Sequence, residues 1–240
     1  MRVLRSLLIA ALAIPALVVL TLGNASAQQS TPPPPPRDVV LGSADAPLEI
    51  IEYGSYACPH CGHFHEENWH MINSEFVETG QVRFIFRPII TQPQQMAVAG
   101  AFLSYCTTDE RYYDAVDLLF IEQSNIIDGL RNQQDVLAIY ERIAGALGVS
   151  RDQMMACFND QANIERLTSN LHQAQIDNIA GTPSFMINGT LLESSRVDGE
   201  LIWVFGGTPL ILNGERVPGD ISQDSIRRII LHFLNESDSD

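Results

Sequence analysis

Two cysteines stand three positions apart in the segment Cys58-Pro59-His60-Cys61. A dithiol exchanges disulfides when its first sulfur is an accessible thiolate and its second sulfur can displace the mixed disulfide that forms. The spacing provides both at the start of a helix. Cys58 then meets the unpaired backbone N–H groups and the positive end of the helix dipole, and Cys61 lies one turn inside. The motif predicts disulfide exchange, with Cys58 as the nucleophile and Cys61 as the resolving thiol.

The two residues between the cysteines suit this role. Pro59 fits the first helical turn, because an N–H at that position would have no partner within the helix. His60 can bring a hydrogen-bond donor or a positive charge close to the Cys58 sulfur. Either would lower the pKa of the thiol and make the disulfide more oxidising.

A metal site is the alternative for this segment, because His63 and His65 follow the cysteines closely. A closed zinc site usually takes two pairs of ligands, and the other cysteines lie far away in the sequence. Cys61, His63 and His65 on one helix cannot all face one ion, because two residues turn a helix by about 200°. We therefore favour redox chemistry with no metal or cofactor, and interpret His63, His65 and His70 as helix-surface or partly packed side chains.

The elements around the motif form a strand, a helix and a second strand. Residues 47–53 are a short apolar run rich in β-branched side chains, which is typical of a buried strand. Apolar side chains then recur every three or four residues until Gly80, as on an amphipathic helix. Residues 82–87 predict a second strand that ends at Pro88. This order predicts a βαβ unit with a parallel strand pair.

The middle of the chain has the periodicity of helices only. Ser150 and Gln153 form a sequence pattern for a capping box, and Gly148 closes the helix before it. We expect helices at about 94–106, 111–122, 136–147 and 160–179, with one more that starts at the capping box.

Strand character returns in residues 181–189, where Asn188-Gly189 is a strong hairpin signal. Residues 190–209 do not fit the second strand of a tight hairpin. We therefore expect an insertion there, with Leu210–Leu212 as the second hairpin strand. A last helix is expected from a Ser222 cap through Phe233.

These features together resemble the thioredoxin superfamily, and within it the DsbA-like periplasmic oxidases. Cys58-Pro59-His60-Cys61 looks like the DsbA active-site tetrapeptide, and residues 181–185, Gly-Thr-Pro-Ser-Phe, look like the cis-proline loop of that family. The resemblance covers nearly all of residues 38–236. It implies an α/β, thioredoxin-like fold with an inserted all-helical subdomain. Residues 38–91 and 180–240 would form the thioredoxin-like domain, and residues 92–179 the insertion.

The resemblance also implies roles for three residues outside the tetrapeptide. A cis peptide bond before Pro183 would hold the Thr182 backbone opposite Cys58, where an extended substrate can pair with it. Glu52 matches the buried acid that many family members place beneath the disulfide, and it could relay a proton when Cys61 attacks. An exposed carboxylate at a strand edge is the alternative for Glu52.

The sequence departs from the family pattern at two points. All 14 basic residues are arginine, so the usual buried lysine partner of the acid is missing, and Arg83 or Arg87 would have to replace it. Thr182, instead of an aliphatic residue, precedes the proline, as it does in isomerases and reductases. The direction of electron flow therefore stays open.

The other two cysteines, Cys106 and Cys157, are the only remaining partners once Cys58 pairs with Cys61. Their disulfide would close a loop of roughly 50 residues and contribute about 4 kcal/mol in the chain-entropy model. A structural disulfide in the helical segment also resembles one branch of the DsbA-like proteins. A second redox-active pair is the alternative.

The N-terminus predicts export. A short basic start, an apolar run over residues 6–23 and the small residues Ala25 and Ala27 indicate a signal peptide at residues 1–27, with an uncleaved membrane anchor as the alternative. Residues 28–37 are proline-rich and predict an extended linker. The net charge of −15 makes nucleic acid an unsuitable partner.

The sequence thus predicts an exported, periplasmic oxidoreductase that donates its Cys58–Cys61 disulfide to reduced or unfolded secreted proteins. A membrane quinone-linked partner would reoxidise it. We expect a monomer. Only about ten residues lie between the proline run and the first strand, too few for an N-terminal dimerisation domain, which argues against an isomerase. The alternatives are a reductase or isomerase of the same fold, a metal carrier that uses the cysteine pair, and an anchored adaptor.

Overall fold

The computed structural model describes residues 33–237. The predicted signal peptide at residues 1–27 and the first part of the linker at residues 28–37 lie outside the described residues. Residues 33–37 form neither helix nor strand. Within the described part of the chain, no helix is both long and apolar enough to cross a membrane.

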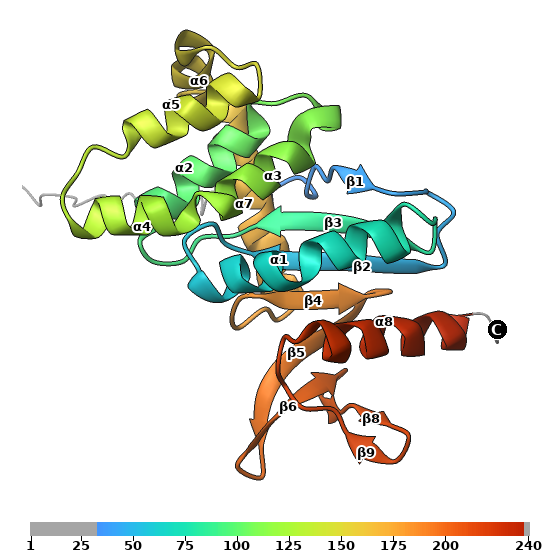
Figure 1. The fold of residues 1–240 in the computed structure, drawn as a ribbon. Coiled ribbons are helices and arrows are strands. Elements are labelled where there is room, and N and C mark those ends of the chain that lie inside the picture. The colour runs from blue at the N-terminus through green and yellow to red at the C-terminus, as the bar shows by residue number, and fades with distance from the viewer. Residues whose placement is uncertain (1–32, 238–240) are drawn as a thin grey trace, which may run out of the picture. The chain divides into compact units, whose positions relative to one another are not determined.

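A seven-stranded mixed sheet carries the fold, in the order β1-β3-β2-β4-β5-β6-β7 (Figure 1). β2 and β3 are parallel and every other neighbouring pair is antiparallel. The helix α1 (Pro59–Ile72) joins the parallel pair, so the predicted βαβ unit is confirmed. The strands are β1 (Val40–Leu41), β2 (Leu48–Gly54), β3 (Val82–Pro88), β4 (Ser184–Ile187), β5 (Thr190–Val197), β6 (Glu200–Phe205) and β7 (Thr208–Pro209).

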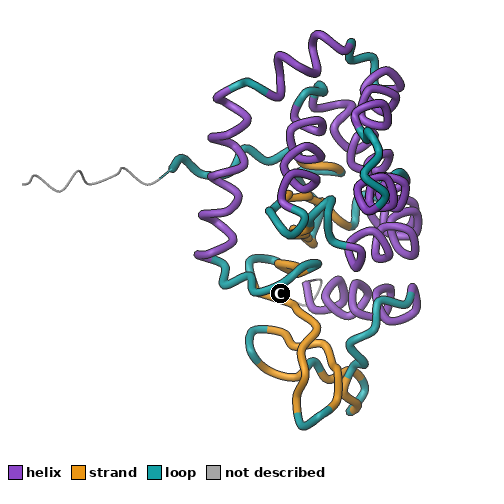
Figure 2. Tube along the Cα trace, turned by 90° about the vertical axis from the view of Figure 1, so that its left-hand side faces the viewer, coloured by secondary structure: helices purple, strands orange, loops and turns teal. Residues whose placement is uncertain are grey.

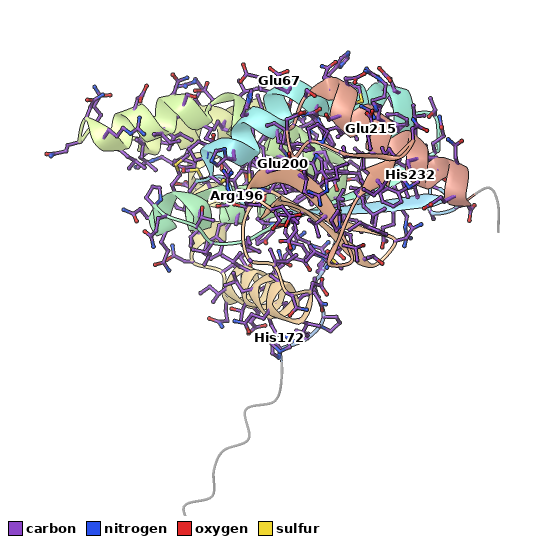
Figure 3. The ribbon with its side chains drawn as sticks, turned by 90° about the horizontal axis from the view of Figure 1, so that it is seen from below. Glu67, His172, Arg196, Glu200, Glu215 and His232 are labelled. Atoms are coloured by element: carbon purple, nitrogen blue, oxygen red, sulfur yellow. A yellow bond between two sulfur atoms is a disulfide. The ribbon has the colours of Figure 1, made fainter. Side chains whose placement is uncertain are left out.

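Side chains of β2 alternate between two cores, one on each face of the sheet. Leu48 and Ile50 belong to the larger core, which includes residues of α1 and α8 (Gln223–Ser237). Ile51 and Tyr53 pack instead with Ala174 of α7 (Gln161–Ile176) in a second cluster. Figure 3 shows α7 and α1 on opposite sides of the sheet, with one labelled residue on each. Because side chains alternate along a strand, Glu52 shares the face of Ile50 and lies beneath α1.

The helices between β3 and β4 form the inserted segment, as expected from the sequence. In Figure 2 these helices lie toward the top of the described part of the molecule, and the strands β5 and β6 lie at the bottom. The predicted capping box is confirmed, since Ser150 and Gln153 exchange both hydrogen bonds at the start of α6. These helices are α2 (Gln94–Tyr105), η2 (Asp109–Arg111), α3 (Tyr112–Ile121), α4 (Gln123–Arg131), α5 (Leu137–Ala146), α6 (Arg151–Phe158) and α7.

Two details differ from the predicted helices. The sequence prediction missed α4, whose start is rich in Gln, Ser and Asn, residues that favour turns as much as helices. The helix after the cysteine pair changes to a π-helix, η1 (Asn73–Val77), before it ends.

A disulfide joins Cys106, at the end of α2, to Cys157 of α6.

The predicted insertion at residues 190–209 is wrong, and so is Leu210–Leu212 as the second hairpin strand. β5 begins directly after Asn188-Gly189 and pairs with β4, and β6 then pairs with β5. Ile211–Leu212 forms a separate small hairpin, β8, with β9 (Glu215–Arg216).

Two-residue turns explain this topology. Four consecutive turns have both central residues at positive φ, which is the geometry of a type I′ turn that matches the twist of two paired strands. The Asp198-Gly199 turn between β5 and β6 was the signal that the sequence prediction overlooked. The four turns are Asn188-Gly189, Asp198-Gly199, Gly206-Gly207 and Asn213-Gly214.

We expect Gly199→Ala to lower the free energy of unfolding by about 1 kcal/mol, because a Cβ is disfavoured at positive φ. Gly199 has a φ of +89° and open space where the Cβ would lie. Gly145→Ala is the matched control, since open space surrounds that glycine too and it lies within α5. The control should stabilise the protein by about 0.5–1 kcal/mol in urea unfolding. Equal effects of the two substitutions would contradict the turn assignment.

Candidate active site

The cysteine pair lies at the start of α1, directly after β2 (Figure 1). Cys58 is the N-cap residue with an extended backbone, and Pro59 is the first residue of the helix. Both cysteines are free thiols. Cys58 keeps 9% of its surface exposed, whereas Cys61 keeps none, and Pro59 and His60 are exposed. A reacting partner can therefore approach the first sulfur but not the second.

The surroundings of Cys58 lower the pKa of its thiol to about 5. The largest contribution is the hydrogen bond that the Cys61 thiol donates to the Cys58 sulfur. The Thr182 side chain and the backbone N–H groups of Cys61 and His60 add to it, and burial opposes them. The sequence prediction gave His60 a hydrogen-bond donor or a positive charge near the Cys58 sulfur, and in the structure the backbone N–H of His60 contributes a hydrogen bond to it.

The surroundings of Cys61 act in the opposite direction. Burial raises the pKa of this thiol well above its usual value, and the hydrogen bond to Cys58 and the charge of Glu52 raise it further. The backbone N–H of Ser55 donates to Cys61 Sγ at 3.4 Å and opposes the shift. At neutral pH, Cys58 is therefore a thiolate and Cys61 a thiol, although the two side chains are chemically identical. An acid–base pair needs such a difference in protonation.

The loop before β4 faces Cys58. The Thr182–Pro183 peptide bond is cis, and Cys58 Sγ lies 3.4 Å from the Thr182 carbonyl oxygen. Pairing between β2 and β4, in which Tyr53 lies opposite Ser184, holds this loop next to the end of β2. The structure therefore brings together Thr182, Pro183 and the cysteine pair, as the sequence prediction expected.

Glu52 is fully buried, so the alternative of an exposed carboxylate at a strand edge is wrong. Its Oε2 atom forms a hydrogen bond of 3.0 Å with His65 Nε2. The proposed arginine partners are also wrong. Arg83 pairs with Glu49, and Arg87 pairs with Asp38 at 2.7 Å, because both arginine side chains leave the sheet away from the core that holds Glu52.

His65 is therefore the partner of the buried acid, and the interpretation of it as a surface or partly packed side chain is wrong. Its side chain is 2% exposed and stacks on Phe120 with the ring centroids 4.0 Å apart. His63 and His70 are exposed, as expected. A signal for this pairing was present in the sequence, because His65 follows Cys61 by four residues and so shares its helix face.

Gln123 supports the active-site loop and was missed by the sequence analysis. Its Nε2 atom donates to the carbonyl oxygens of Tyr56 at 2.9 Å and Cys58 at 3.0 Å. A Cβ at Gly62 would collide with the Gln123 side chain. No local pattern could reveal this contact, since Gln123 opens α4, 65 residues after Cys58.

A family model described as thioredoxin matches residues 35–201. The chain belongs to this thioredoxin family. A Rickettsia typhi protein named as a protein-disulfide oxidoreductase is 28% identical over 169 residues, which are 67% of this chain and 58% of the relative. The chain thus spans less than two thirds of that relative's length.

Solved structures show that this member of the thioredoxin family has the fold of DsbA proteins. Wolbachia pipientis α-DsbA1 is 23% identical, with a TM-score of 0.64 over 86% of this chain and 96% of its own. A protein-disulfide isomerase of Novosphingobium aromaticivorans is 24% identical, with a TM-score of 0.60 over 82% and 96%. The predicted fold class, a thioredoxin-like α/β fold with helices inserted, is confirmed.

An open cavity of about 1080 Å³ runs beside α1 of this thioredoxin-family protein, between α1 and the pair α3 and α4. Within residues 33–237, no three His, Cys, Asp or Glu side chains gather closely enough to hold a metal ion. The residues of α1 that line the cavity include Pro59, Gly62, His63, His65, Glu66 and Trp69.

Proposed function

We propose that this protein is an exported, DsbA-type thiol–disulfide oxidoreductase that donates its Cys58–Cys61 disulfide to reduced proteins. The observation that supports this most strongly is the opposite shift of the two thiol pKa values, downward for Cys58 and upward for Cys61. A stable Cys58 thiolate favours the reduced form of the protein, so the oxidised form transfers its disulfide readily to a substrate. The names of the Rickettsia and Wolbachia relatives agree with this chemistry.

The reaction we propose has two exchange steps. A substrate thiolate attacks Cys58 Sγ, the bond to Cys61 breaks, and the electron pair passes to Cys61 Sγ. Cys61 then takes up a proton, since its raised pKa makes the thiolate unfavourable. A second substrate thiolate attacks the substrate sulfur of the mixed disulfide. Cys58 leaves as a thiolate, and its low pKa makes it a good leaving group.

Substrate binding and proton transfer complete the proposal. We assign Thr182 and Pro183 to the binding of an extended substrate segment, because the Thr182 backbone lies against the sulfur that is attacked. We assign Glu52 to the delivery of the proton to Cys61, since it is the acid buried on that side of the pair. The Cys106–Cys157 disulfide has a structural role in this proposal.

The cellular setting also belongs to the proposal. The basic and apolar N-terminal sequence supports export to the periplasm. The substrates would be reduced or unfolded secreted proteins, the protein would act as a monomer, and a membrane quinone-linked partner would restore the disulfide.

The test is to mix the oxidised protein with a reduced, unfolded substrate that contains two cysteines. We expect one disulfide to pass to the substrate per protein molecule, as measured by mass and by counting free thiols. Protein that has been reduced beforehand is the control and should transfer none. Failure to oxidise the substrate would contradict the proposal, and rapid reduction of an oxidised substrate by the reduced protein would favour the reductase alternative.

A further inference from the structure

The buried pair of Glu52 and His65 leaves one polar atom unused at each end. Glu52 Oε2 and His65 Nε2 bind each other at 3.0 Å, with 0% and 2% of the side chains exposed. Glu52 Oε1 and His65 Nδ1 have no hydrogen-bond partner among the described residues. Buried polar atoms are usually paired, because burial without a partner costs free energy. The free atoms therefore point to a function.

The two residues differ in their position relative to the cavity. His65 lines the open cavity between α1 and the helices α3 and α4, whereas Glu52 and Cys61 do not. Glu52 lies on the far side of the histidine, close enough for its charge to raise the pKa of the Cys61 thiol. Of these three residues only His65 lines the cavity, and Glu52 interacts both with His65 and, through its charge, with Cys61.

The proposed exchange needs a proton at the buried thiol of Cys61. When a substrate thiolate opens the disulfide, Cys61 Sγ receives an electron pair and must be protonated. Cys61 has no exposed surface, so water cannot reach its sulfur directly. A carboxyl group that gives up its proton must then recover one, and within the described residues its hydrogen-bond partner is His65.

We propose that His65 conducts protons between the cavity and Glu52, and so acts as the positioning and relay residue for Cys61. This inference rests on the proposed disulfide exchange. As the disulfide opens, Glu52 gives a proton to Cys61 Sγ and recovers one from His65 Nε2. His65 in turn takes a proton at Nδ1 when a fluctuation of the cavity lining admits water to this atom, which is buried in the structure. In the reverse exchange, each proton moves in the opposite direction.

Titratable and charged groups on five elements surround the ring and set its environment. Glu52 faces it from β2. On α3, burial raises the pKa of Asp117, and the charge of the nearby His65 acts in the opposite direction. Other titratable or charged groups line the same cavity, namely His63, Glu66 and His70 of α1, Glu110 of η2, Tyr113 and Asp114 of α3, and Asp128 and Arg131 of α4.

The first test uses His65→Gln, whose amide can still donate to Glu52 but cannot carry a proton. The rate at which oxidised protein forms a mixed disulfide with reduced glutathione is measured from pH 5 to 8 and corrected for the glutathione thiolate. We expect the corrected rate of His65→Gln to be about tenfold lower than that of the wild-type protein, a smaller loss than the 10²–10⁴ range of direct acid–base catalysis. The corrected rate of the variant should also no longer depend on pH. An unchanged rate and pH profile would overturn the proposal.

A double-variant cycle tests whether His65 acts through Glu52. Glu52→Gln should also slow the reaction, and adding His65→Gln should slow it no further, since the relay is already cut. The same tenfold loss in the Glu52→Gln background would overturn the relay. The Cys58 pKa should stay at about 5 in His65→Gln, because His65 is not among the groups that lower it.

Chemical rescue gives an independent readout that a purely structural role would not move. His65→Ala should be slow, and imidazole added in solution should restore its rate by entering the cavity. Pyrrole, which has a similar size but is not basic at these pH values, is the control and should not restore it. Rescue by both compounds or by neither would count against proton conduction, and should His65→Ala fail to fold, the His65→Gln pH profile decides alone.

The wild-type reaction separates this inference from the proposed function. If the wild-type protein fails to pass its disulfide to either glutathione or a protein substrate, the proposed function fails. If the wild-type protein transfers its disulfide and the His65 variants match it, only the proton relay fails.

Discussion

The Cys58→Ser variant is expected to lose disulfide transfer completely. A serine hydroxyl cannot form the mixed disulfide, and Cys61 cannot take over because it is fully buried and its thiol pKa is well above the usual value. The loss should exceed about 1000-fold in the rate of oxidation of a reduced two-cysteine substrate. Mass spectrometry of the reaction should show no covalent adduct with the substrate.

Cys61→Ser is the matched control, because it removes the other sulfur of the pair. This variant keeps the exposed nucleophile and should accumulate a stable mixed disulfide at Cys58 with a substrate activated as a disulfide. Both variants keep the Cys106–Cys157 disulfide, so urea unfolding can confirm that each is folded. Adducts on Cys61 in the Cys58→Ser protein would show that the roles of the two cysteines have been assigned in the wrong order.

The reactivity of Cys58 toward an alkylating reagent should titrate with a midpoint near pH 5 in the reduced protein. An ordinary cysteine titrates near pH 8.5, and its rate rises about tenfold per pH unit below that value. The rate at Cys58 should instead be nearly flat from pH 6.5 to 8. The measurement is the rate of carboxymethylation between pH 3.5 and 9, with the modified residue identified by peptide mapping.

Two variants make this titration specific. Cys61→Ala removes the thiol that contributes most to the shift, so the midpoint should move upward. Cys58→Ser should show no titration in this range, since burial keeps the Cys61 thiol protonated. A midpoint near pH 8.5 in the wild-type protein would refute the oxidase interpretation.

The same shift predicts how pH affects the stability of the reduced protein. Because the pKa of Cys58 is lower in the folded state than in the unfolded state, the thiolate stabilises the reduced fold. This contribution is complete above about pH 8.5 and is lost as the pH falls through about 5. At pH 7, which lies roughly two units above the folded-state pKa, the thiolate contributes about 3 kcal/mol to the free energy of unfolding of the reduced protein. The oxidised protein has no such contribution, so the stability gap between the two forms should close toward pH 5.

The sequence was sufficient for the parts of the site that lie within one stretch of chain. The start of α1 places Cys58 and Cys61 by spacing alone, and the parallel strands on both sides follow from short-range patterns. The loop at Thr182-Pro183 was found through its resemblance to a family, since nothing local says which residue it faces.

Contacts between distant segments could not be predicted in the same way. The partner of Glu52 was sought among arginines because a lysine was missing, yet the structure uses a histidine from the next helix. Gln123 reaches the active-site loop from a helix that the sequence did not indicate. The hairpin of β5 and β6 was missed for a different reason, because its Asp198-Gly199 turn is a local signal that was overlooked.

The hydrogen bonds of Gln123 couple the inserted helices mechanically to the segment that carries Cys58. One amide group, carried by α4, holds the carbonyl groups on either side of Ala57. If the helical segment separates from the sheet, the Tyr56 carbonyl loses this donor and the Cys58 carbonyl keeps only the backbone N–H groups of α1, so the backbone that orients Cys58 is loosened. Local unfolding of the insertion and inactivation of the redox centre should therefore be one cooperative event, with a shared rate of amide hydrogen exchange.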